Sequence, residues 1–196
     1  YCNLININES GEEKNIIIMY FVDKTDFISL RNRYNDEKPI AAILQVDNIE
    51  EVIKETEEAL RPALVAEVDR RVNAWAALNN ASIQKYSNGE YMIYFSHKQL
   101  MSMEEKRFDI LDSIREINSG NKIPITLSIG VGVNGKNHAE LQKFCTSAMD
   151  IALGRGGDQA VVKDNEKLSF YGGKTKAVEK RTRVKARVIA YALRQL

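Results

Sequence analysis

The sequence predicts an α/β sandwich built on a mixed β-sheet. Two apolar runs, IAAILQVDN at 40–48 and PITLSIGVGV at 124–133, have the length and β-branched content of buried strands. Between them, KYSNGEYMIYF at 85–95 has the composition of a β-hairpin. Apolar residues at helical spacing fill the segments around these strands, so helices and strands alternate along the chain.

The N-terminal segment predicts one strand followed by one helix. The run NIIIMYFVD at 15–23 is rich in β-branched residues and is expected to be a buried strand. Phe27, Leu30 and Tyr34 then recur at helical spacing, and Pro39 ends the pattern. Two interpretations stay open: the end of a preceding domain with a stalk helix, or the first strand and helix of the main domain.

Two helices are expected after the strand at 40–48. The first is the charged segment IEEVIKETEEAL at 49–60. The second begins at Pro62, where the missing N–H of proline costs nothing at a first helical position. One face of the second helix is apolar at Leu64, Val68, Val72 and Trp75.

The hairpin is expected at the centre of the sheet. Its turn is the dipeptide Asn88-Gly89, which readily takes the two positive φ values of a type I′ turn.

The rest of the domain predicts helix, strand, helix and strand. A helix at 103–118 directs Phe108, Leu111, Ile114 and Ile117 inward. After the strand at 124–133, Asn137 and Glu140 resemble a capping box that opens another helix. QAVVK at 159–163 then gives a short last strand.

Beyond residue 165 the chain becomes basic. Eight Lys and Arg residues between 174 and 194 stand against one acid, Glu179, and Val184, Val188 and Ala192 form an i, i+4, i+8 row. A basic helix of this kind either contacts nucleic acid or presents a solvated face on a connector to another domain.

Composition limits the function classes. The chain has 196 residues, 44% of them hydrophobic and 28% charged, which is typical of a globular domain with attached segments. The net charge of +1 gives no argument for nucleic acid or an anionic membrane as partner. No apolar run approaches 18 residues, so the chain is expected to be soluble. Cys145 is expected to be a buried reduced thiol, which suits a cytosolic compartment.

The order of the strand at 40–48, the hairpin at 85–95 and the strand at 124–133 resembles the GGDEF domain of bacterial diguanylate cyclases. The resemblance covers residues 40–163, and TLSIGV at 126–131 is a close match. It implies a GGDEF-like, nucleotidyl-cyclase-type α/β sandwich with a central mixed sheet, flanked by an N-terminal strand and stalk helix and by a C-terminal basic helix.

The tail ALGRGGDQAVV…FYGGKTKAVEKRTRVKARVIAYAL, from residue 152, is similar to the degenerate GGDEF region of membrane-bound cyclic-di-AMP phosphodiesterases. In that family two transmembrane helices precede a PAS sensor domain, then this domain, then a DHH/DHHA1 catalytic unit. The implied divisions are the end of a PAS-like domain (1–24), a stalk helix (25–39), a degenerate GGDEF domain (40–165) and a linker helix (166–196). The chain, which does not begin with Met, is expected to be an excised piece of such a protein.

The resemblance also implies that cyclase chemistry is lost. The cyclases hold two divalent ions with the first Asp of D-x-D and with the third-place acid of the signature loop. Here these places are Gln45 and Gly89, neither of which can supply the anionic oxygen that Mg²⁺ prefers. Asp47 and Glu90 match the neighbouring acidic positions. They either recruit one ion weakly or serve as a helix cap and an ion-pair partner.

Nucleotide-binding groups remain at the same place. The family's guanine-reading positions fall near Ile53 and Pro62, which cannot replace an amide or a carboxylate. The triphosphate lysine is missing, and Arg155 either substitutes for it or is an exposed loop cation. The expected binding residues, for ATP with Mg²⁺ held weakly, are Asp47, Asn48, Ser87, Asn88, Gly89, Glu90 and Arg155.

The leading hypothesis is a regulatory, non-cyclase module that binds ATP weakly, hydrolyses it slowly at most, and passes a signal from the sensor to the hydrolase. It would form a homodimer through the stalk helix and the domain, on the cytoplasmic side of the bacterial membrane in the parent protein. No catalytic residue is expected in this chain; cyclic-di-AMP and Mn²⁺ would bind only in the DHH unit beyond Leu196. No contact with nucleic acid or the membrane is expected. The alternative is a ligand-free dimerisation and spacer scaffold.

Incubation of the chain with GTP and Mg²⁺ is expected to give no cyclic dinucleotide, because both principal metal-binding carboxylates are missing. Chromatography of the reaction products measures this directly. Formation of cyclic-di-GMP above the level of a protein-free control would contradict the interpretation of Gln45 and Gly89.

Overall fold

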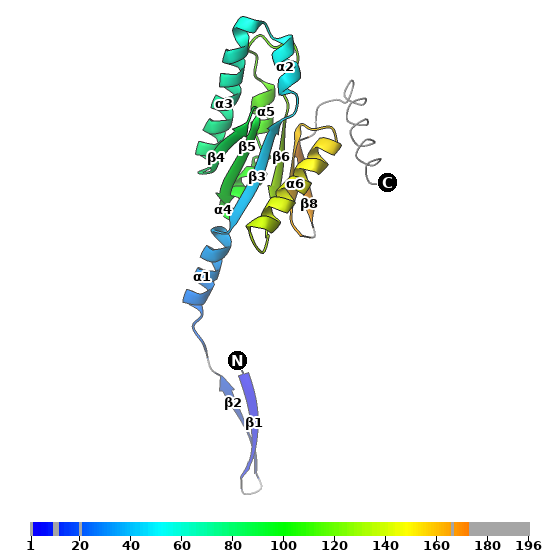
Figure 1. Ribbon diagram of the computed structural model, residues 1–196. Helices are drawn as coiled ribbons and strands as arrows, with labels where there is room; N and C mark the ends of the chain where they lie inside the picture. The colour runs from blue at the N-terminus through cyan, green and yellow to red at the C-terminus, as the bar shows by residue number, and fades with distance from the viewer. Residues whose placement is uncertain (1, 10–11, 20, 166, 173–196) are drawn as a thin grey trace, which may run out of the picture. The chain divides into compact units, whose positions relative to one another are not determined.

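The structure, a computed structural model, divides into two units, Tyr1–Asn35 and Asp36–Leu196 (Figure 1). Each unit is described by itself. The described residues are 2–9, 12–19, 21–165 and 167–172. The predicted basic helix at 174–196 therefore lies outside the described residues.

The first unit contains a two-stranded hairpin and one helix. Strands β1 (Cys2–Glu9) and β2 (Glu12–Met19) pair antiparallel, and helix α1 (Thr25–Asp36) follows. The strand predicted at 15–23 therefore ends at Met19, and residues 21–23 are exposed, with Phe21 at 93%. β1 was not predicted. No residue of α1 is buried, and its apolar row is 64–66% exposed at Phe27, Leu30 and Tyr34.

The second unit is built on a six-stranded sheet in the order β4-β5-β3-β6-β7-β8. Only the neighbours β6 and β7 are parallel; the other pairs are antiparallel. The α/β fold with a mixed sheet is thus confirmed. The strands are β3 (Pro39–Val46), β4 (Ser82–Ser87), β5 (Glu90–Ser96), β6 (Leu127–Gly132), β7 (Gln159–Lys163) and β8 (Leu168–Gly172).

The hairpin differs from the expectation in two ways. β5 pairs with β3, which leaves β4 at the edge of the sheet instead of its centre. Gly89 has a positive φ of 75° but Asn88 does not, so the turn is not type I′. A bulge between Lys85 and Ser87 accommodates the turn.

At the other edge, β8 extends the sheet to Gly172, past residue 165 where the domain was expected to end. Its side chains do not form a continuous apolar run, so the strand gave no clear signal in the sequence.

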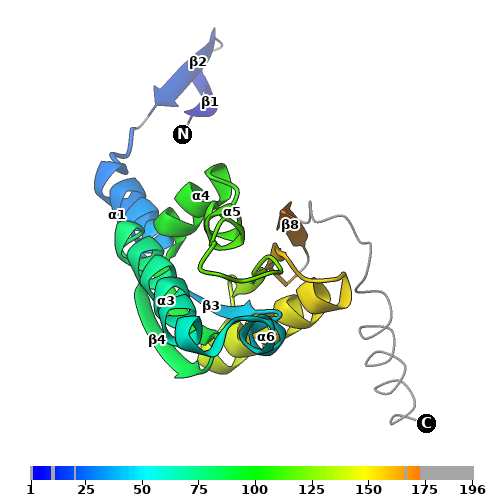
Figure 2. The ribbon, with the colours of Figure 1, turned by 90° about the horizontal axis from the view of Figure 1, so that it is seen from above.

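Helices cover both faces of the sheet (Figure 2). Side chains of α2 to α5 form one core with alternate strand residues such as Leu44 and Leu127, and α6 packs on the opposite face through Ala148 and Ala152. No helix in the described part of the chain is long and apolar enough to cross a membrane. The helices are α2 (Ile49–Glu55), the 3-10 turn η1 (Glu58–Leu60), α3 (Arg61–Leu78), α4 (His97–Glu105), α5 (Ile110–Arg115) and α6 (His138–Gly154).

The single helix predicted at 103–118 is in fact two helices, α4 and α5. The chain turns sharply between them because two consecutive residues, Arg107 and Phe108, have left-handed φ angles of 54° and 53°. This corner buries Phe108 against Tyr171 of β8, with 5.2 Å between the ring centroids. The four residues predicted to point inward are all buried, so the apolar periodicity was right although the helix is interrupted.

α6 lies directly on the backbone of β6. A Cβ atom on Gly130 would lie 2.5 Å from both the Cys145 carbonyl oxygen and the Met149 nitrogen. The predicted burial of Cys145 is confirmed, and its Sγ donates to the Ala41 carbonyl at 2.9 Å. Burial raises the pKa of this thiol to about 11.

Gly130→Ala is expected to destabilise the chain by about 1–3 kcal/mol, since the new methyl group must push α6 off the sheet. Gly154→Ala is the matched control, because a Cβ there meets nothing within 4 Å and its φ is not positive. The control is expected to be neutral or to stabilise by up to about 1 kcal/mol. Urea unfolding measures both, and equal stability of the two variants would contradict the close packing.

Candidate functional site

The candidate site lies where β3 ends. The amide of Val46 donates to the carbonyl of Gly89 at 2.8 Å, and the amide of Asp47 donates to the carbonyl of Thr126 at 2.8 Å. The hairpin turn, the end of β3 and the start of β6 are therefore tied together. A Cβ on Gly89 would lie 3.2 Å from the Cβ of Val46, so the turn is seated tightly on the strand end.

Asp47 holds the loop that follows α6. Its Oδ2 accepts a hydrogen bond from the amide of Asp158 at 2.9 Å. A Cβ on Gly157 would lie 2.6 Å from the same oxygen, and the φ of Gly157 is 76°, so only glycine fits. The other carboxylate oxygen, Oδ1, is buried and has no hydrogen-bond partner among the described residues. Asp47 is thus an anchor for this loop with one oxygen left over.

Asp158 continues the chain of contacts to the opposite face of the sheet. Its carboxylate, on a side chain only 3% exposed, accepts from Arg115 of α5 at 2.8 Å. Burial lowers the pKa of Arg115, but its hydrogen bonds to Asp158 and Asp112 outweigh burial, so the pKa rises. Sequence reasoning missed Gly157, Asp158 and Arg115. The two consecutive glycines before an acid were the signal for a tight loop.

Asn48 is placed beside Asp47 but its side chain is already used. Its Nδ2 donates to the Pro124 carbonyl at 2.8 Å, and its Oδ1 accepts from the amide of Thr126 at 3.0 Å. The residue is 9% exposed. Both ends of this amide therefore clamp the segment that leads into β6, and little of it is left for a ligand.

The turn at 87–90 presents a mixed surface. Ser87 and Asn88 are exposed, whereas Gly89 is buried and Glu90 is partly buried. Neither the Asn88 nor the Gly89 amide donates to a backbone acceptor within the described residues. The pKa of Tyr86 is raised, first by burial and then by the nearby charge of Glu90. The turn therefore combines exposed polar side chains with the amide of the exposed residue Asn88, which has no backbone acceptor in the described structure.

Gln45 stands between two polar neighbours across the sheet. Glu90 of β5 and Ser128 of β6 are its direct Cα partners, so the three side chains lie on one face. The Ser128 hydroxyl is fully buried and has no partner in the described structure. In this row, where a cyclase has a carboxylate, the central side chain is neutral. Ser128 was not singled out in the sequence, because it reads there as one position of a buried strand.

The two-ion arrangement of the cyclases does not fit these residues. Within the described ranges, no group of three or more His, Cys, Asp or Glu side chains could hold a metal ion. Gln45 and Gly89 supply no charge, and one oxygen of Asp47 is committed to Asp158. A single weakly held ion at Asp47 and Glu90 stays a prediction.

Arg155, at the C-terminal end of α6, is exposed, and its side chain contacts β8 and the start of β7. Its guanidinium carbon lies 4.4 Å from the centre of the Phe170 ring on β8, and its Nε donates to Gln159 at 3.3 Å. The structure therefore brings together the end of β3 and the hairpin turn, but it turns the predicted phosphate-binding cation toward β8.

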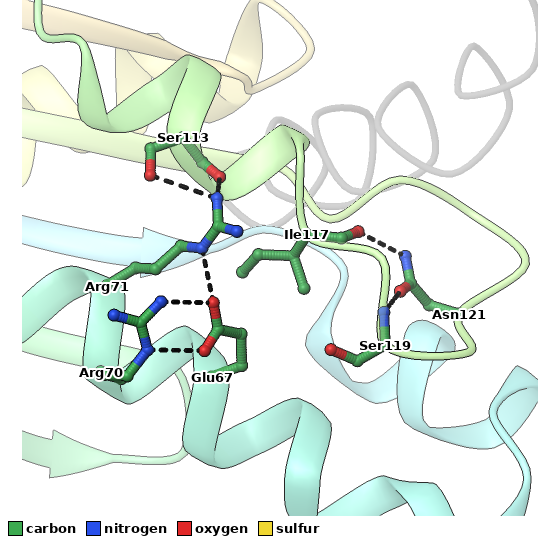
Figure 3. A network of polar contacts seen from close by, with 7 residues as sticks. All are labelled: Glu67, Arg70, Arg71, Ser113, Ile117, Ser119 and Asn121. Carbon is green, nitrogen blue, oxygen red and sulfur yellow. Dashed lines mark hydrogen bonds and ion pairs between the residues drawn. The ribbon is translucent and has the colours of Figure 1, made fainter.

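A separate polar network joins α3 to α5 (Figure 3). Glu67 accepts from Arg70 and Arg71, and Arg71 also donates to the Ser113 carbonyl on α5. The hydrogen bonds from the two arginines lower the pKa of Glu67 to about 2. A groove of about 270 Å³ beside this network is lined in part by both arginines and by Trp75. Arg71 thus holds the two helices together, whereas Arg70 pairs with Glu67 on its own helix.

Comparison with known proteins identifies the family. Residues 44–170 match the family described as "Cyclic-di-AMP phosphodiesterase GdpP-like, GGDEF domain". The chain belongs to this GdpP-like GGDEF family. It is 39% identical over 180 residues to the cyclic-di-AMP phosphodiesterase PdeA of Listeria monocytogenes, covering 91% of this chain. It is 36% identical over 197 residues to the cyclic-di-AMP phosphodiesterase GdpP of Geobacillus thermodenitrificans, covering 97% of this chain.

This GdpP-like chain spans 27% of the length of the first relative and 30% of the length of the second. Its fold is that of solved GGDEF domains. The diguanylate cyclase/phosphodiesterase of Caldicellulosiruptor saccharolyticus matches with a TM-score of 0.55 at 16% identity, over 74% of this chain and 87% of that one. The active GGEEF domain of a Vibrio cholerae diguanylate cyclase matches with a TM-score of 0.53 at 14% identity, over 71% and 89%.

Asp47→Ala is expected to lower the free energy of unfolding by about 1–3 kcal/mol, because the amide of Asp158 loses its acceptor inside the protein. Asp150→Ala, at an exposed position of α6, is the control and should change stability by less than about 0.5 kcal/mol. Chemical denaturation compares the two. An Asp47→Ala variant as stable as the control would mean that the carboxylate does not anchor the loop.

Proposed function

We propose that this chain is the regulatory, non-cyclase module of a longer cyclic-di-AMP phosphodiesterase. It binds ATP weakly at the end of β3 and relays that binding and the state of the preceding sensor to the hydrolase domain. The family membership and the relatives named as cyclic-di-AMP phosphodiesterases support the parent's activity. The hydrolase and the sensor lie in the part of such a protein that this chain does not span.

One observation supports the proposal above the others. The turn at 87–89 packs closely on the end of β3, as a triphosphate-binding turn must. Gln45 and Gly89 stand where the resemblance to the cyclases implies the carboxylates that drive cyclisation. Exposed hydroxyl, amide and backbone N–H groups can still donate to phosphate oxygens. A site with donors but without paired cations favours loose binding of a nucleotide that carries its own Mg²⁺.

Calorimetry with ATP and Mg²⁺ tests this function. The double variant Ser87→Ala/Asn88→Ala is expected to weaken binding about tenfold or more, because side-chain donors to a charged phosphate are lost. The matched control is Ser82→Ala/Gln84→Ala, at exposed positions of the same hairpin. It should bind ATP as tightly as the unmodified chain does. A thermal-shift assay gives a second measure, with about 2.7 kcal/mol of stabilisation at ATP a hundredfold above Kd.

A second function, a ligand-free dimerisation and spacer scaffold, is favoured by the exposed apolar row of α1 at Phe27, Leu30 and Tyr34. Dimerisation through this row is compatible with either function. Absence of any calorimetric or thermal response at millimolar ATP, together with a dimer in sedimentation, would leave only the scaffold.

A further inference from the structure

The contact between Arg155 and Phe170 joins the candidate nucleotide site to the last described strand. Arg155 follows α6 and begins the loop that Asp47 anchors three residues later, at the amide of Asp158. Phe170 lies in the middle of β8. With 4.4 Å between the guanidinium carbon and the ring centre, the pair is a cation–π contact between two exposed side chains.

The backbone of this loop has no donor to offer an anion. The amides of Arg155, Gly156 and Gly157 donate to carbonyls at the end of α6, and the amide of Asp158 donates to Asp47. The Arg155 guanidinium is different. Only its Nε donates to a described residue, at 3.3 Å, so both of its terminal amino groups are available.

β8 is held differently on its two faces. On one face, Tyr171 packs on Phe108 and its hydroxyl donates to Glu104 at 2.9 Å. On the other face, Phe170 is 42% exposed and is stacked under Arg155. Among the strands that the structure describes, β8 pairs with β7 alone.

We propose that the Arg155 guanidinium has two alternative partners, Phe170 of β8 and the phosphates of a bound nucleotide. In the free chain it stacks on Phe170. When a nucleotide binds, the guanidinium leaves the ring for the phosphate oxygens, because charge-assisted hydrogen bonds are stronger than an exposed cation–π contact. Loss of the stack loosens one face of β8, so occupancy of the site is reported to the strand that leads out of the domain. This mechanism rests on the proposed function.

The direction in which one substitution changes ATP affinity tests whether Arg155 moves from Phe170 to the phosphates. Phe170→Leu removes the ring that competes for Arg155, so ATP affinity is expected to rise by about two- to fivefold. Phe170→Trp gives a better cation–π partner and is expected to lower the affinity. Damage to the fold would lower affinity in both variants. Unchanged or weaker binding of ATP by Phe170→Leu would therefore overturn the proposed movement of Arg155.

Two controls isolate the contact. Tyr171→Phe removes the hydrogen bond to Glu104 on the other face of β8 and should leave ATP affinity unchanged. In an Arg155→Gln background, Phe170→Leu should have no further effect, since there is no cation left to share. A Phe170→Leu effect that persists in that background would also reject the mechanism.

Hydrogen exchange of residues 168–172 gives an independent readout. Saturating ATP with Mg²⁺ is expected to speed exchange in β8 of the unmodified chain and to have no such effect in Arg155→Gln. If neither the unmodified chain nor any variant binds ATP, the proposed function fails, and the proposed movement of Arg155 fails with it. If ATP binds but neither the hydrogen exchange of β8 nor the ATP affinity of Phe170→Leu changes, the proposed function stands and only the movement of Arg155 is rejected.

Discussion

The hydrogen bond from the Asp158 amide to the Asp47 carboxylate is the interaction on which the rest of the site depends. It fixes the loop after α6 over the end of β3, and it requires Gly157, since a Cβ there would overlap the carboxylate. The same contact places Asp158 for its ion pair with Arg115, so α5, β7 and β3 share one polar connection. A buried charge is tolerated only when it is paired or hydrogen-bonded; here Asp47 accepts from the Asp158 amide, and the Asp158 carboxylate pairs with Arg115. The loop and the strand end are therefore firmly connected.

The contacts that hold this fold use different atoms from those that cyclase chemistry would need. The fold needs the tight turn at Gly89, the clamp of Asn48 and the anchor at Asp47, and all three are structural contacts within the domain. The chemistry needs paired anionic ligands, which neither Gln45 nor Gly89 supplies. Because the two requirements use different atoms, the first can be met without the second.

The sequence was most informative where periodicity is strong. The strands at 40–48 and 124–133 and the apolar face of α3 follow from spacing alone, and most of their apolar residues are buried as expected. The α4–α5 corner could not be predicted in this way. Arg107 and Phe108 have left-handed φ angles there, and the ring that they bury packs on Tyr171, a residue more than sixty positions away in the sequence. β8 was missed for a similar reason, since an exposed edge strand has little apolar signal. For the site, residue types indicated the place, but which oxygen or guanidinium is already engaged depends on tertiary contacts.

The close seating of α6 on β6 limits how this domain can respond to a ligand. With Gly130 pressed against the helix backbone, α6 cannot slide or tilt without breaking the packing along its length. Movement at its C-terminal end must therefore come from rotation of exposed side chains, which takes picoseconds to nanoseconds, and not from a slow shift of the helix. The packing of α6 on β6 therefore keeps the helix fixed relative to the sheet up to the residue at which the loop to β7 begins.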